Sequence, residues 1–214
     1  MARPLVIAYH LIWTAYGWWL PNDPRGSTSR GVTEDRIAQL GPHHYGRRRH
    51  LPPLETLDAF YREADDVLKF ERLPLVQQDI QRVAEGIAEA VRTRRYTCYA
   101  CAILPDHVHL VIRKHRDKAE DMIESLQAAS RLRLSSAGLR PPEHPVWATG
   151  GWKGFLDRPD AVRRTIAYIE DNPAKQRLPR QTWPFVVAYD GWPLHPGHDP
   201  NSPYARRMRQ ERRG

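Results

Sequence analysis

The sequence predicts an α+β protein in which helices pack on an antiparallel sheet. Short apolar runs rich in branched residues alternate with longer segments whose apolar residues recur every three or four positions. Only the tight turn Pro105-Asp106 separates two of the short runs, which therefore form an antiparallel hairpin. The resulting order, strand-helix-strand-strand-helix-strand, is typical of a ferredoxin-like sandwich. The 214 residues suit one domain with a long insertion.

The first strand is expected over residues 5–14, which are apolar on both faces as in a central strand. It contains His10, which in such a setting is usually a hydrogen-bonded core residue but could line a site on the same sheet face. An insertion is expected over residues 15–74, first as a long loop rich in Trp, Pro, Gly and Arg and then as a short helix over 54–70.

The later elements follow from periodicity and from residues that end helices. Gly138 and the prolines after it end one long helix, and Asn172-Pro173 is expected to end the last one. In chain order we expect a helix over 75–94, strands over 96–103 and 107–113, a helix over 117–137, a glycine-bent hairpin over 146–156 and a helix over 159–171.

The charge balance favours a polyanionic partner. Lys and Arg number 33 against 25 Asp and Glu, a net charge of +8, and nucleic acid is the commonest partner of such a protein. The two cysteines, Cys98 and Cys101, are interpreted as core residues in a reducing compartment. No apolar run approaches a membrane span and the N-terminus lacks a signal-peptide layout, so we expect a cytoplasmic, nucleoid-associated protein without a membrane partner.

A single residue, Val108, separates His107 from His109 in the second strand of the predicted hairpin. Side chains alternate along a strand, so both imidazoles point to the same face and could hold one metal ion. With 10 histidines in the chain, a His-x-His arises easily by chance, and two surface histidines are the alternative interpretation.

The last predicted helix carries Tyr168 outside its apolar stripe. Arg164 and Asn172 are four residues before and after it, so the three polar side chains share one helix face. Such a face could form half of an active site. The alternative is an amphipathic tyrosine at an exposed helix edge.

Several arginines are candidates for DNA binding through phosphate contacts, among them Arg164 beside Tyr168. Arg25 lies in the loop of the insertion, whose tryptophans could alternatively anchor an ordinary surface loop. The cluster Arg47–Arg49 is either a solvated loop or a phosphate-contacting patch. Residues 183–214 are proline-rich and then basic, and are expected to form a flexible arm on nucleic acid or a disordered solubilising tail. The arm carries Arg206, Arg207 and Arg209.

Four stretches together resemble the HUH single-strand endonucleases, and among them the REP-associated tyrosine transposases. The stretches keep the family's order and spacing across residues 5–190 or so. They are YHLIW at 9–13, YG with WLPNDPRG at 16–26, LPDHVH at 104–109 and YIEDNP at 168–173.

The resemblance implies a transposase-like HUH nuclease domain over residues 1–182, followed by a basic tail that helps to read a DNA mark beside a hairpin. By resemblance, His107, His109 and Asn172 ligate Mg²⁺ or Mn²⁺. Tyr168 attacks a phosphodiester of single-stranded or hairpin DNA, becomes a 5′-phosphotyrosine and leaves a free 3′-OH. The resemblance favours a monomer over a homodimer.

Two other functions remain compatible with the residues alone. One is a nucleic-acid-binding protein on the same fold that catalyses nothing. The other is a metal-dependent hydrolase of a small substrate that uses His107 and His109, with Tyr168 incidental.

Overall fold

A four-stranded antiparallel sheet organises the computed structural model, which describes residues 5–46, 48, 50–193 and 201–211. The strand order is β2-β3-β1-β4, and the central strand β1 pairs with both β3 and β4. This order, with a helix between β1 and β2 and another between β3 and β4, is that of a ferredoxin-like fold, so the predicted fold class is confirmed. The strands are β1 (Ala8–Thr14), β2 (Cys98–Ile103), β3 (His107–Arg113) and β4 (Trp152–Leu156).

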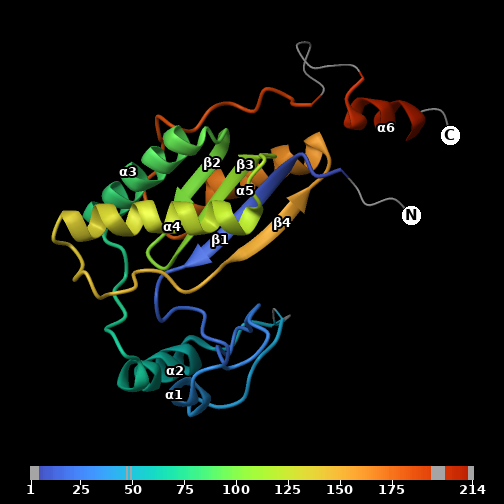
Figure 1. The fold of residues 1–214 in the computed structure, drawn as a ribbon. Coiled ribbons are helices and arrows are strands. Elements are labelled where there is room, and N and C mark those ends of the chain that lie inside the picture. Colours follow the sequence, from blue (N-terminus) through green and yellow to red (C-terminus); the bar gives the residue numbers. More distant parts are fainter. Residues whose placement is uncertain (1–4, 47, 49, 194–200, 212–214) are drawn as a thin grey trace.

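Helices cover both faces of the sheet (Figure 1). α3 (Gln77–Arg94) and α4 (Ala119–Ser136) pack against each other and against one face. α5 (Pro159–Lys175) crosses the other face and contacts β2, β3 and β4. The shorter helices are α1 (Asp35–Ala38), α2 (Leu54–Val67) and α6 (Pro203–Glu211). None of the described helices is long and apolar enough to cross a membrane.

The alternation of side chains along β1 and β3 divides the core in two. Leu11 and Leu110 are fully buried in the larger cluster, with α3 and α4. Val111 faces the other way, into a smaller cluster with Val162 and Ile169 of α5. The larger cluster is continuous and apolar, whereas the α5 face of β1 and β3 also carries the histidines.

The insertion closes on the turn between β2 and β3. It contains α1, α2 and a small apolar cluster around Phe60 and Tyr61, and it lies beyond the end of the sheet at which β1 ends (Figure 1). At its start, the Ala15 amide donates to the Asp106 carbonyl (2.8 Å), and at its end the Leu75 amide donates to the Pro105 carbonyl (2.7 Å). Both ends of the insertion therefore hold the turn that precedes His107.

Two predicted elements differ from the structure. Residues 146–156 do not form a hairpin, because only Trp152–Leu156 is a strand and it pairs with β1. The Gln127 side chain of α4 binds the carbonyls of Ala148 and Gly150, which removes these groups from strand pairing. The helix expected to end at Asn172-Pro173 instead continues to Lys175, since Pro173 lies in its last turn and lacks only one amide donor.

The prediction of a flexible arm from residue 183 onward is also wrong for most of the residues described there. Trp183 and Phe185 pack against the larger cluster, and the Val187 amide donates to the Cys98 carbonyl (2.9 Å). Residues 203–211 form α6, whose Tyr204 is buried in the cluster of the α5 face. Apolar side chains among the prolines thus dock this segment on the sheet. In the cluster Arg47–Arg49, the first and third arginines lie outside the described residues.

Candidate active site between the central strands and α5

Three imidazoles gather on the sheet face that α5 covers. His107 and His109 lie on this face of β3, with ring centroids 4.8 Å apart. His10 lies on the same face of β1, where the strand register places it diagonally across from His109 at a centroid distance of 5.2 Å. The predicted common face of His107 and His109 is therefore present, and a third histidine joins them.

Each of the two histidines of β3 has its Nδ1 atom held by a neighbour. The Nδ1 of His107 lies 2.6 Å from Oδ1 of Asp106, and the Nδ1 of His109 lies 3.0 Å from Nε2 of His10. Partners on Nδ1 fix the tautomer and the orientation of an imidazole and direct its Nε2 to a metal. Asp106 and His10 therefore serve as orienting groups for the two predicted ligands.

Burial keeps His10 and His109 neutral. It lowers the pKa of His10 to about 4. Burial, reinforced by the repulsion that His107 and His10 exert when they are protonated, lowers the pKa of His109 to about 2. Burial by itself would raise the pKa of Asp106, but the hydrogen bond with His107 and the charges of His107 and Arg25 hold it below its ordinary value. At neutral pH His10 and His109 thus present lone pairs beside an ionised carboxylate.

Tyr168 of α5 lies over the histidines. Its ring centroid is 5.7 Å from that of His109 and 6.3 Å from that of His10, and its side chain is 45% exposed. The ammonium of Lys175 lies 4.7 Å from the centre of the phenol ring. A hollow of about 230 Å³ opens here, lined by Tyr168, His10, Arg164, Ala161 and Thr165.

Asn172 lies one turn beyond Tyr168 on α5 and is only 6% exposed. Its buried amide nitrogen has no hydrogen-bond partner among the described residues. A rotation of the amide by 180° would present the oxygen in the same place, as a ligand for a hard cation. The described residues contain no group of three or more His, Cys, Asp and Glu arranged for a metal.

The predicted DNA-binding arginines occupy three different places. Arg164 lines the hollow beside Tyr168 and pairs with Asp160 (2.7 Å) on the exposed side of α5. Arg25 is held inside the insertion by Asp23 (2.7 Å) and lies 3.7 Å from the ring centre of Trp19, which gives it a structural role there. The other three arginines lie on α6, near the beginning of β1.

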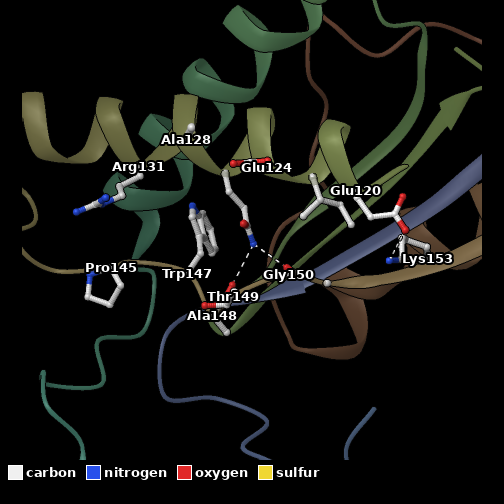
Figure 2. Close-up of a pocket in the computed structure, with 13 residues that line it drawn as sticks. Glu120, Glu124, Ala128, Arg131, Pro145, Trp147, Ala148, Thr149, Gly150 and Lys153 are labelled. Carbon is white, nitrogen blue, oxygen red and sulfur yellow. Dashed lines mark hydrogen bonds and ion pairs between the residues drawn. The ribbon is translucent and has the colours of Figure 1, made fainter. Parts of the chain in front are cut away.

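A larger groove, of about 540 Å³, lies elsewhere (Figure 2). It runs between α4 and residues 145–153, on the far side of the sheet from α5, and its lining includes neither the histidines nor Tyr168. Lys153 and Glu120 form an ion pair across it (2.7 Å), and Gln127 spans it at the carbonyls of Ala148 and Gly150. Of the two hollows, only the smaller one adjoins His10 and Tyr168.

Comparisons with known proteins give two similar solved structures. One is a REP-associated tyrosine transposase bound to a REP hairpin, with 12% identity and a TM-score of 0.45 over 82% of this chain and 72% of that one. The other is assigned as a transposase from Deinococcus radiodurans R1, with 15% identity and a TM-score of 0.41 over 80% of this chain and 94% of that one. No family model and no curated protein matches the sequence. Both structures are described as transposases, the class that the sequence motifs resemble, but at these identities and scores only the side chains around Tyr168 inform on function.

Proposed function

We propose that this protein is a metal-dependent DNA endonuclease and strand transferase of the transposase type, with Tyr168 as its nucleophile. The observation that carries the proposal is the position of Tyr168, a half-exposed phenol over neutral His10 and His109 in an open hollow. A tyrosine with a structural role would bury its ring or bond its hydroxyl. The ring of Tyr168 is half exposed, and its hydroxyl makes no hydrogen bond to any described residue.

The residues divide the reaction between them. A phenol has a pKa of about 10 and attacks a phosphodiester poorly at neutral pH without help. Mg²⁺ or Mn²⁺, held by Nε2 of His107 and His109 and by the side-chain oxygen of Asn172, would polarise the phosphoryl oxygen and offset the charge of the transition state. Lys175, whose ammonium lies 4.7 Å from the centre of the phenol ring, places a positive charge beside the phosphate that Tyr168 would attack.

The bond changes balance without another reactant. The Tyr168 oxygen forms a bond to phosphorus as the bond from phosphorus to the 3′ oxygen breaks. The phenol loses its proton and the 3′ oxygen gains one, which leaves a 5′-phosphotyrosine and a free 3′-OH. The aryl ester is itself activated, so a second 3′-OH can displace Tyr168 and rejoin strands without ATP.

The substrate class follows from the access to the hollow. A phosphodiester has to enter beside Arg164 and reach a phenol that stands close to the sheet surface. Single strands and hairpin ends expose a phosphate from more sides than a duplex does. We therefore propose single-stranded or hairpin DNA as substrate. We also propose that a monomer is sufficient, because His10, His109 and Tyr168 of one chain lie side by side. We further propose that the protein acts near the nucleoid, where DNA is found.

The test is a covalent adduct with labelled DNA. A panel of hairpin oligonucleotides with single-stranded flanks is incubated with Mn²⁺ and resolved on denaturing gels. A label at the 3′ end should travel with the protein, whereas a label at the 5′ end should be released with the 3′-OH. Chelator and Tyr168→Phe should abolish the adduct, and Tyr45→Phe, at an exposed tyrosine of the insertion, should not.

Each competing function predicts a different result. A protein that only binds nucleic acid would retain the hairpins in chelator and form no adduct with any of them. A hydrolase of small substrates would turn over equally well after Tyr168→Phe. Adduct formation by Tyr168→Phe would overturn the assignment of the nucleophile.

A further inference from the structure

Trp152 is an exposed indole beside the candidate active site. It begins the edge strand β4, where its side chain is 43% exposed, and it belongs to none of the apolar clusters among the described residues. Its ring stands edge-on to His10, with centroids 5.4 Å apart and an interplanar angle of 83°. Trp152 and Tyr168 thus both contact the same imidazole.

Gly154 makes room for this position. The strand register pairs Gly154 with His10, two residues along β4 from Trp152 and therefore on the same face. A Cβ atom at Gly154 would lie 2.6 Å and 2.8 Å from two carbons of the six-membered ring of Trp152. The indole therefore lies across the strand in the space that a side chain at position 154 would fill. Because Gly154 has no side chain, the indole can lie beside His10.

We propose that Trp152 is a stacking platform for one unpaired nucleobase next to the phosphate that Tyr168 attacks. An indole that is exposed but held in place loses little freedom when a flat ring stacks on it, and every base has a face that can do so. The surroundings suit a nucleotide, because Arg164 and Lys175 supply positive charge on the same side of the sheet. The platform rests on the proposed function, since it gives one subsite to that DNA.

The neighbouring aromatic residue of β4 provides a matched control. Phe155 is 61% exposed, and its ring packs edge-on against Tyr9, on the sheet face away from the histidines. Trp152→Ala and Phe155→Ala each remove one exposed ring from the same strand, but only the first ring adjoins the hollow. Gly154→Ala keeps the indole and displaces it.

The experiment measures DNA binding by fluorescence anisotropy in the full-length Tyr168→Phe background, which prevents cleavage. The probes are oligothymidine and a hairpin with single-stranded flanks, each also prepared with an abasic site at successive positions. Trp152→Ala should weaken binding by about 5- to 150-fold, the range for loss of one stacked base. The weakening should disappear at one abasic position of the hairpin flank, because the base and the indole are then removed as a pair.

The remaining variants sharpen the result. Trp152→Phe should retain most of the affinity, Gly154→Ala should lose part of it, and Phe155→Ala should change nothing. Equal weakening by Trp152→Ala at every abasic position, or no weakening, would overturn the platform. A fall in molar mass by light scattering in Trp152→Ala would also overturn it, since a second copy of the chain would then cover the indole.

This readout separates the platform from the proposed function. Failure of wild-type protein to form an adduct with any hairpin refutes the catalytic proposal, while the abasic comparison still decides for or against Trp152. Conversely, the wild-type protein could form the adduct normally while the effect of Trp152→Ala on affinity is the same whichever base is removed. That result would refute the platform alone.

Discussion

The two faces of the sheet carry different tasks on the same strands. On β1 and β3, Leu11 and Leu110 point to α3 and α4 and are fully buried. Their immediate neighbours His10 and His109 point to α5, bond to each other and lie under the half-exposed Tyr168. Adjacent residues of one strand thus belong to the apolar core on one face and to the proposed active site on the other, so point variants can separate the two.

The number of helices on each face explains the difference. Two packed helices cover the apolar face, whereas on the other face α5 alone crosses the strands, α6 adds Tyr204 to the cluster, and a hollow of about 230 Å³ remains beside Tyr168. In the wall of that hollow, His10 is paired with His109 behind it, whereas Tyr168 is half exposed to solvent. The following variants test this division, in order of decreasing expected loss in the free energy of unfolding.

Leu110→Ala should cause the largest loss of stability. Truncation of a fully buried leucine removes apolar burial and leaves a cavity, at a cost of about 2–5 kcal/mol. Chemical denaturation followed by circular dichroism measures this cost. Mn²⁺ affinity per folded molecule should be unchanged. A loss of Mn²⁺ affinity in the folded fraction would break the division between the faces.

His109→Ala, one residue earlier in the strand, should lower the free energy of unfolding less than Leu110→Ala does, but it should abolish metal binding. The unpaired Nε2 of buried His10 costs about 1–3 kcal/mol. Mn²⁺ binding, measured by titration calorimetry, should become undetectable. His115→Ala, outside the candidate site, is the matched control and should bind as wild type does. Retention of Mn²⁺ by His109→Ala would show that the ion sits elsewhere.

Asp106→Asn tests the orienting contact at the other histidine. The amide keeps the shape of the side chain but weakens its bond to Nδ1 of His107 (2.6 Å), so we expect a stability change of about 1 kcal/mol or less. Mn²⁺ affinity should fall by about 10- to 100-fold, as for other partners of ligating histidines. Asp117→Asn provides the comparison, and equal effects of the two substitutions would refute a specific role for Asp106.

Tyr168→Phe should leave stability within about 0.5 kcal/mol of wild type, because the side chain is half exposed and its hydroxyl makes no hydrogen bond to the described residues. Mn²⁺ binding should persist as well. A denaturation midpoint well below that of wild type would mean that Tyr168 has a structural role and is not an available nucleophile.

Local patterns were sufficient to predict the strand with His107 and His109, the helix with Tyr168, and the fold class. The partnership of His10 with His109 was not predictable, because it depends on the register between β1 and β3, which pair from distant parts of the chain. For the same reason the sequence suggested a local hairpin at 146–156, where the structure pairs β4 with β1.

Other differences arise where tertiary packing overrides a local signal. Asn172-Pro173 favours a helix end, but α5 continues because its buried face extends to these two residues. The prolines after residue 183 indicate a loose tail, although Trp183 and Phe185 among them find places on the core. The direct contact of Trp152 with His10 could not be predicted either, since it requires the neighbouring Gly154 and the β1–β4 pairing.

The most direct measurement of the central claim is the identity of the residue that carries the DNA. The adduct formed by wild-type protein with a hairpin and Mn²⁺ is digested with nuclease and trypsin and sequenced by mass spectrometry. We expect one nucleotide-modified peptide, Thr165–Lys175, in which Tyr168 is the sole tyrosine, with the phosphate on its phenolic oxygen. A phosphate on any other residue, or an adduct that forms equally well in chelator, would contradict it.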